Sequence, residues 1–231
     1  MSMHTGHRQR LKQQFLKNGL DGFTDIQVLE LLLFYSIPRI DTNPIAHNLL
    51  ERFGSLDRVL EAPPAELMEV EGIGENAATF LTLITAASRY YQIKRSENVK
   101  ILTSVTECGN YLLPHFHGRT NETVFLLCLD AKCKVLCCKE LGEGSVNSAS
   151  VPIRRIVETA LLSKAVSVVL AHNHPSGVAV PSPEDVMSTR RTAAALAAVE
   201  ITLVDHIIVA DDDFVTLGQS GLFRAEEYKH G

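Results

Sequence analysis

Residues 166–186 read VSVVLAHNHPSGVAVPSPEDV, and this stretch indicates both a fold and a site. Its apolar, β-branched beginning is typical of a buried strand. Pro175 ends that strand, because proline has no backbone N–H for the sheet. Ser182-Pro183-Glu184-Asp185 then combines an N-cap serine, a proline at the first helical position and an acid at the third. We therefore expect a strand, a short loop and a capped helix.

Two histidines, His172 and His174, follow the predicted strand with one residue between them. In an extended segment their side chains project from the same face, whereas Asn173 points the other way. Asp185 returns to the same end of the strand and would supply a carboxylate as third ligand. Two histidines and one carboxylate leave a position free for water, as in catalytic zinc sites. We therefore predict that His172, His174 and Asp185 bind Zn²⁺.

A purely structural explanation of this stretch stays open. Ser182 and Asp185 taken alone more often form a helix cap than a catalytic pair. Two histidines at a strand end can also be ordinary loop residues. The conjunction of a strand, H-x-H-P, a short loop and S-x-x-D favours metal binding.

The sequence around this stretch alternates between strand and helix patterns. Strands are predicted at 122–130, 134–141, 166–171 and 201–210, with a hairpin partner at 211–217, and helices at about 105–113, 152–163 and 184–200. A glycine- and serine-rich loop is predicted at 142–150. This alternation predicts an α/β domain with a mixed sheet and flanking helices.

The first hundred residues predict helices alone. Thr24 and Gln27 form a capping box, and Asn43-Pro44 supplies an N-cap and a first helical residue. Gly72-Ile73-Gly74 makes a tight turn into an alanine-rich helix, a pattern that resembles a helix-hairpin-helix module. The charged segment 92–100 is predicted to be a linker. We predict a small all-α domain with this motif at 1–95 and a metal-binding domain at 101–225.

A glycine hairpin of this kind can present backbone N–H groups to a phosphate. Here the turn is flanked by Glu69, Glu71 and Glu75, and no Lys or Arg directly follows the glycines. Residues 1–100 contain 11 Lys+Arg and 12 Asp+Glu, so the segment is not basic. We expect at most weak DNA contact through this domain, and favour a structural or protein-docking role.

Composition narrows the class of protein. The chain has 231 residues, 45% of them hydrophobic, and a net charge of −5, so no general basic field attracts nucleic acid. The N-terminus is polar, and no apolar run reaches the roughly 20 residues that span a bilayer. We expect a cytoplasmic protein without membrane contact.

Four of the five cysteines lie in 128–138 without a C-x-x-C spacing, and we expect reduced core and strand residues rather than a second metal site.

H-N-H-P followed by S-P-E-D resembles the H-x-H-P…S-x-x-D signature of the JAMM/MPN metalloproteases. The segments AHNHPSG, LDAKCKVL, SVNSASV and VDHIIVA resemble the RadC-like branch more closely. Upstream, NLLERFGSLDRVL and ELMEVEGIG resemble the helical N-terminal domain of that family, so nearly the whole chain is covered. Two features differ from the patterns of these proteins. Asn173 stands where many JAMM/MPN peptidases have Ser or Thr, although Asn is usual in the RadC-like branch. The glycine hairpin also lacks the basic residue that is expected after its glycines.

The resemblance implies a JAMM/MPN-like domain that hydrolyses amide or isopeptide bonds of a peptide or protein substrate. Glu122 matches the general base, which would take a proton from zinc-bound water, with Glu140 and Glu143 as alternatives. Ser182 would donate a hydrogen bond to the oxyanion. Without the resemblance, Glu122 is more simply a solvated acid at a strand edge.

Three further histidines could in principle contact a metal ion, and a second function is also open. His115 and His117 form a second H-x-H pair, but no strand precedes it and we expect a loop. His206 is either a structural strand residue or a hydrogen-bond partner of a metal ligand.

The alternative function is a DNA-associated accessory protein, of repair or recombination type, with the JAMM-like domain as scaffold. Nucleobase deamination is set aside because H-x-E and P-C-x-x-C are missing.

Overall fold

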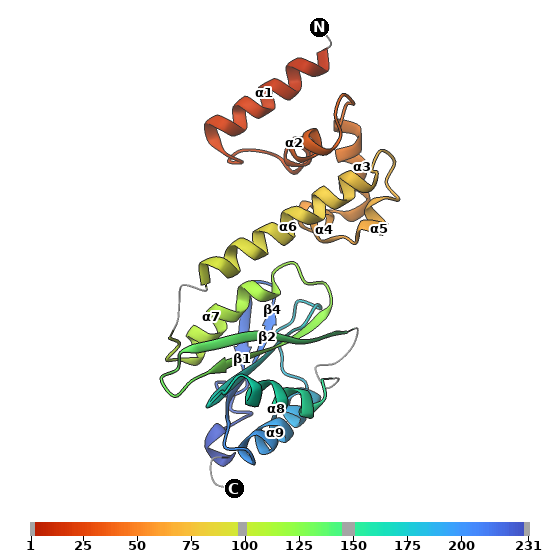
Figure 1. The fold of residues 1–231 in the computed structure, drawn as a ribbon. Helices are drawn as coiled ribbons and strands as arrows, with labels where there is room; N and C mark the ends of the chain where they lie inside the picture. The colour runs from red at the N-terminus through yellow and green to blue at the C-terminus, as the bar shows by residue number, and fades with distance from the viewer. Residues whose placement is uncertain (1–2, 97–100, 145–150, 229–231) are drawn as a thin grey trace. The chain divides into compact units, whose positions relative to one another are not determined.

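The computed structural model describes residues 3–96, 101–144 and 151–228. The chain divides into two compact units, Met1–Ser88 and Arg89–Gly231, which are described separately (Figure 1). The first unit is helical and the second contains a five-stranded mixed sheet flanked by helices. The predicted fold class, an α/β domain preceded by an all-α region, is confirmed.

The helices of the first unit pack around their own apolar core. They are α1 (Met3–Asn18), α2 (Asp25–Ser36), α3 (Asn43–Phe53), α4 (Leu56–Glu61), α5 (Pro64–Leu67) and the first part of α6 (Glu75–Ser96). Leu29, Leu49 and Leu81 are fully buried in the core that α2 to α6 share, whereas α1 packs Leu11 against Leu31 and Phe34 of α2. The predicted capping box of Thr24 and Gln27 is present at the start of α2.

Two local predictions in this region are wrong. The N-cap of α3 is Thr42, because its carbonyl accepts the first helical hydrogen bond, from Ala46 N–H at 2.9 Å. Asn43 is therefore already helical. The predicted linker at 92–100 begins too early, since α6 continues through Ser96. Residues 97–100 lie outside the described residues.

The second unit carries five strands in the order β2-β1-β3-β4-β5. Its elements are α7 (Val105–Phe116), β1 (Glu122–Leu129), β2 (Val135–Gly144), α8 (Ile153–Leu162), β3 (Ser167–Asn173), α9 (Pro183–Ala197), β4 (Thr202–Ala210), β5 (Asp213–Thr216) and a short 3-10 helix, η2 (Ala225–Tyr228). β1 pairs antiparallel with β2 and β3, β3 pairs parallel with β4, and β4 pairs antiparallel with β5. The sheet is mixed, as predicted.

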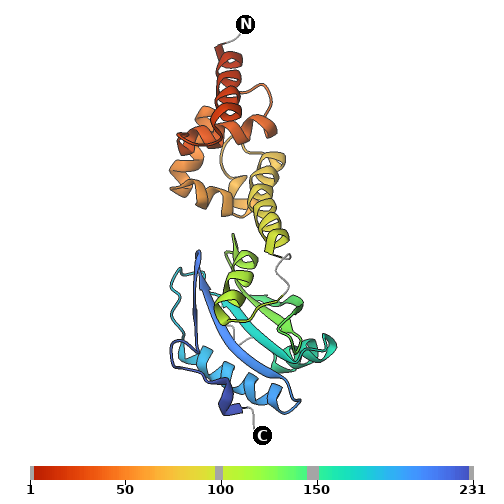
Figure 2. The same cartoon turned by 90° about the vertical axis from the view of Figure 1, so that its left-hand side faces the viewer.

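Both faces of this sheet are buried, which explains the continuous apolar runs of its central strands. In β1, Leu126 and Cys128 face the core shared with α8 and α9, whereas Phe125 and Leu127 face the core shared with α7. Figures 1 and 2 show α7 on one side of the sheet and α8 and α9 on the other. Side chains of alternate residues therefore belong to different cores.

The parallel pair β3 and β4 is connected through α9, which is the arrangement that positions the site. The carboxyl end of β3 and the N-terminus of α9 meet, since His172 of β3 lies 3.2 Å from Asp185 in the first turn of α9. In sheets of this kind, binding sites gather at the carboxyl ends of strands.

α7 extends further than the sequence predicts. It runs through Phe116 although Pro114 lies inside it, so His115 is helical and buried rather than part of a loop. His115 and Phe116 both pack their rings against Phe125, which accounts for the extra helical turn. Of the predicted loop at 142–150, residues 142–144 belong to β2 and residues 145–150 lie outside the described residues.

The five cysteines are free thiols, and Cys128, Cys137 and Cys138 lie in strands as expected. Cys133 differs from the expectation, because it lies in the turn between β1 and β2 with a φ of 57°. Burial raises the pKa of Cys108 and Cys128 to about 12, so both stay protonated near neutral pH. Within the described part of the chain, no helix combines the length and apolar character needed to span a bilayer.

Candidate metal centre

The side chains of His172, His174 and Asp185 converge on one point. His172 Nε2 lies 2.9 Å from His174 Nε2 and 3.2 Å from Asp185 Oδ1, and His174 Nε2 lies 3.5 Å from Asp185 Oδ2. Zinc binds such atoms at about 2.0–2.2 Å in a tetrahedron, so its ligand atoms lie about 3.3 Å apart. Among the described residues, this is the one group of three or more His, Cys, Asp or Glu side chains with ligand atoms this close.

Hydrogen bonds indicate which nitrogen of His174 is free to coordinate. His174 Nδ1 lies 3.1 Å from the carbonyl oxygen of Val178, and a carbonyl can only accept, so Nδ1 carries the hydrogen. The Nε2 lone pair of neutral His174 therefore points to His172 and Asp185. A hydrogen bond with Asp185 raises the pKa of His174, so a proton and a metal ion compete for this nitrogen.

Asp185 remains ionised in this group. Burial raises the pKa of the Asp185 carboxyl, but its contacts with the His172 and His174 rings and the hydrogen bond from Ser182 outweigh that effect and lower the pKa below its usual value. A buried carboxylate beside two nitrogen lone pairs is stabilised by a cation. The donor set therefore fits a metal ion.

Asp185 is held in place by the cap of α9. The Ser182 hydroxyl donates to Asp185 Oδ2 at 2.6 Å and accepts from Asp185 N–H at 3.1 Å, and Ser182 N–H donates to Oδ2 at 2.8 Å. This reciprocal capping box agrees with the predicted N-cap serine and acidic third residue. The single Ser182 hydroxyl hydrogen is directed to Asp185.

Asn173 points away from the histidines, as predicted, and holds the segment that precedes β1. Its Oδ1 accepts from Thr123 N–H at 2.7 Å, and its Nδ2 donates to the Asn121 carbonyl at 3.1 Å. The two bonded backbone groups belong to the residues directly before and after Glu122. The sequence gives no signal for this contact, because the partners are 50 residues apart.

The sheet register places Glu122 on the same face as His172. Val124 pairs directly with His172 across β1 and β3, and Glu122 lies two residues before Val124. Cross-strand partners and residues two apart share a face. Glu122 and His174 also line one hollow of about 360 Å³.

The two alternative acids lie on the opposite face of the sheet. Glu140 pairs with Phe125 and Glu143 with Thr123 in the β1–β2 register. Arg119 binds Glu140 at 2.7 Å and lies 3.7 Å from Glu143. These contacts favour Glu122 over Glu140 and Glu143 as the carboxylate beside the histidines.

Behind His172 lies a pair of buried side chains, His206 of β4 and Thr189 of α9. His172 Nδ1 is 2.8 Å from His206 Nε2, and His206 Nδ1 is 2.5 Å from Thr189 Oγ1. Thr189 in turn donates to the Asp185 carbonyl at 2.6 Å. Burial lowers the pKa of His206 well below its usual value, which keeps the imidazole neutral. The sequence suggested His206 as a partner of a ligand but gave no reason to select Thr189.

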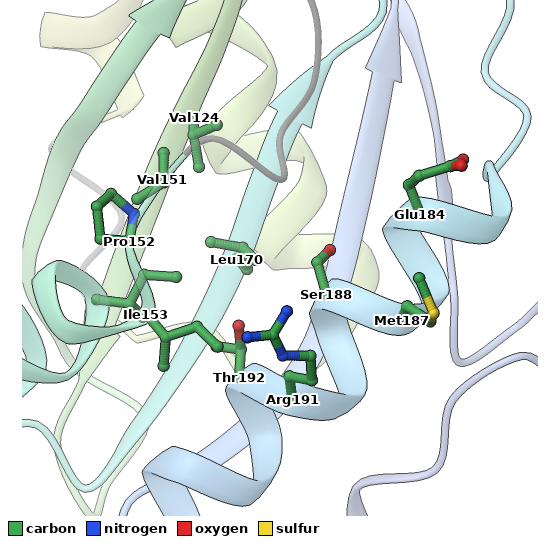
Figure 3. A pocket seen from close by; sticks show the side chains of 11 residues that line it. Val124, Val151, Pro152, Ile153, Leu170, Glu184, Met187, Ser188, Arg191 and Thr192 are labelled. Carbon is green, nitrogen blue, oxygen red and sulfur yellow. The ribbon is translucent and has the colours of Figure 1, made fainter.

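A second hollow, of about 210 Å³, lies beside the first turns of α9. Figure 3 shows its apolar wall, with Val124 and Leu170 from the sheet and Ile153 from α8. Ser188 and Arg191 border it from α9. Ser188 also donates to the Asp185 carbonyl at 3.0 Å, which places this hollow next to the metal-ligand group.

The other histidine pair does not join the group. The His115 ring packs at a tilt against Tyr111 and Phe125, and His117 is the C-cap residue of α7. Both lie outside the convergent group formed by His172, His174 and Asp185.

Comparison with known proteins identifies the family. Residues 102–222 match the model of the RadC-like JAB domain, and this match covers the whole sheet and the His172–Asp185 stretch. The chain belongs to the RadC family. A UPF0758 protein of Ruegeria pomeroyi is 36% identical over 222 residues, which are 96% of each chain. A UPF0758 protein of Fusobacterium nucleatum subsp. nucleatum is 34% identical over 224 residues, which are 94% of this chain and 97% of the relative. The RadC-like resemblance inferred from the motifs is therefore confirmed, over nearly the full length.

Proposed function

We propose that this RadC-family protein is a zinc-dependent hydrolase of amide or isopeptide bonds, acting on a peptide or protein substrate. The observation that carries the proposal is the convergence of three ligand atoms, one of them from His174, which lines a hollow together with Glu122. The JAB/MPN-like domain family includes metallohydrolases, which agrees with this reading.

His172, His174 and Asp185 would hold the ion through two Nε2 atoms and one carboxylate. Zn²⁺ bound there supplies Lewis-acid chemistry and lowers the pKa of a water molecule toward neutrality. His174 and Glu122 line the hollow from which a substrate carbonyl would approach. Two histidines and one carboxylate would leave a position for this chemistry.

Glu122 is the proposed general base. Its half-buried carboxylate takes the proton of the attacking water and delivers it to the leaving amine, so one group serves as base and then as acid. The Asn173 bonds to Thr123 and Asn121 fix the backbone on both sides of Glu122 and would keep its carboxylate in place.

Ser182 is the proposed donor to the oxyanion. To donate there, its hydroxyl has to turn away from Asp185 Oδ2. Asp185 would keep the bond from Ser182 N–H, at 2.8 Å, so the cap need not open. Donors of this kind act most strongly when they are aimed in advance, and the Ser182 contribution is therefore expected to be smaller than that of Glu122.

The proposal is tested by a cleavage screen of a pooled peptide library and isopeptide-linked peptides with the zinc-loaded protein. Glu122→Gln should keep zinc and lower kcat/KM by about 10²- to 10⁴-fold, because it removes the base but no ligand. Glu143→Gln, an acid of the opposite sheet face, is the matched control and should change kcat/KM less than about threefold. Cleavage by Glu122→Gln at the wild-type rate, or no cleavage of any member by the wild type, would contradict the proposal.

A further inference from the structure

We propose that Thr189 and His206 are positioning residues that fix His172 in the tautomer that can bind a metal through Nε2. This inference rests on the proposed metal site and goes beyond its ligands. It is carried by three consecutive hydrogen bonds that run from the Asp185 backbone to the His172 ring.

The direction of the first bond follows from its acceptor. Thr189 Oγ1 lies 2.6 Å from the Asp185 carbonyl oxygen, which can only accept, so the Thr189 hydroxyl uses its one hydrogen there. Toward His206, the Thr189 oxygen can then only accept. His206 Nδ1, at 2.5 Å, must carry the hydrogen of that bond.

The remaining bond is set by the same reasoning. A neutral imidazole with hydrogen on Nδ1 has a lone pair on Nε2, so His206 Nε2 accepts. Its partner at 2.8 Å is His172 Nδ1, which must donate. His172 therefore carries its hydrogen on Nδ1 and presents the Nε2 lone pair to His174 and Asp185, as a metal ligand requires.

Burial makes this relay hard to replace. His172, Thr189 and His206 each have 0% exposed surface, so bulk water does not substitute for a missing partner. Thr189 lies one helical turn after Asp185 on α9, and His206 lies on β4 beside β3. The relay thus links two ligands from different elements, and a change in Thr189 acts on both.

The test compares Zn²⁺ affinity among Thr189→Val, Thr189→Ser and Thr192→Val, measured by competition with a chromophoric chelator at one pH. Thr189→Val keeps the shape but removes the hydroxyl, and should weaken zinc binding about 10- to 100-fold. Thr189→Ser keeps the hydroxyl and should stay within about threefold of the wild type. Thr192 is a buried threonine of the same helix outside the relay, so Thr192→Val controls for a general effect on α9 and should leave zinc affinity unchanged.

A second readout, the ¹⁵N chemical shifts of the His172 ring, reports the tautomer without any hydrolysis. The relay predicts hydrogen on Nδ1 in the wild type and loss of that preference in Thr189→Val. Equal zinc affinities of Thr189→Val and Thr189→Ser, an equal loss in Thr192→Val, or hydrogen on His172 Nε2 would overturn the inference. Zinc binding and tautomer effects without any cleavage would contradict the proposed hydrolase and leave the relay supported.

Discussion

Asn173 connects the metal-ligand strand to the segment that carries Glu122. Its buried amide accepts from Thr123 N–H and donates to the Asn121 carbonyl. An amide can satisfy both partners because it carries a donor and an acceptor, whereas a carboxylate only accepts. An amide at position 173 can therefore bond both backbone groups, which a carboxylate could not do.

Asn173→Asp should lower stability and turnover together. The change places a carboxylate oxygen against the Asn121 carbonyl and leaves buried polar atoms without a hydrogen between them, which costs about 1–3 kcal/mol. Urea unfolding and the cleavage assay measure the two effects. Asn110→Asp makes the same chemical change at an exposed position of α7 and should cost less than about 0.5 kcal/mol. Equal behaviour of the two variants would contradict the Asn173 bridge.

The protonation of His174 makes zinc binding depend on pH. Asp185 raises the pKa of His174 above its usual 6.5, so this nitrogen holds a proton more tightly in the folded chain. In protein treated with chelator, that proton adds stability below pH 6.5, and the added stability is lost as the pH rises through the raised pKa. Zinc must displace the proton, so its affinity should fall about tenfold per pH unit below that pKa. Zinc competition between pH 5.5 and 8.5 checks this, and a flat profile would contradict it.

Among the helices, α9 has a cap with two roles, because Ser182 both starts the helix and bonds the Asp185 carboxylate. Ser182→Ala should cost about 0.5–2 kcal/mol of stability and also weaken zinc binding. Ser104 caps α7 by accepting from Glu107 N–H, far in sequence from the metal ligands, so Ser104→Ala is a matched control. It should show a similar loss in urea unfolding and unchanged zinc affinity. A loss of zinc affinity in both variants would show that the effect is general.

The glycine hairpin of the first unit is built for close packing. Gly72 has a φ of 92°, and a Cβ there would lie 2.7 Å from Ile45 Cδ1 of α3. Gly54 has a φ of 90°, but its nearest neighbour would be the flexible Arg58 side chain at 3.9 Å. Gly54→Ala should cost about 1–2 kcal/mol for the left-handed backbone alone. Gly72→Ala should cost about 1–3 kcal/mol more than Gly54→Ala, because its methyl group would overpack against Ile45. Urea unfolding measures both losses, and equal losses would contradict the close-packing role of Gly72.

The elements that could be predicted from sequence are those with local causes. The Ser182 cap and the i, i+2 spacing of His172 and His174 depend on neighbouring residues, and the structure has both. The bonds of His206 and Asn173 depend on packing between segments 17 to 50 residues apart, which no local pattern records. The extent of α7 was missed for the same reason, because contacts of His115 with β1 outweigh the local effect of Pro114.

For the whole molecule, the two compact units have separate apolar cores, and the metal-ligand group lies in the second. In the first, Glu69 pairs with Arg52, and Glu71 and Glu75 are exposed beside the glycine turn. An acidic turn repels phosphate, so the DNA-associated alternative gains little physical support from this unit. It stays a prediction.

The central claim is that His172, His174 and Asp185 form a zinc site, and metal content tests it most directly. We expect about one zinc per chain in purified wild-type protein equilibrated with zinc and desalted. A His47→Ala, His117→Ala variant removes two histidines outside the group and should retain that content. A His172→Ala, His174→Ala variant should retain less than about a tenth of it, because one carboxylate does not hold zinc alone. Equal zinc in the wild type and the His172→Ala, His174→Ala variant would contradict the account.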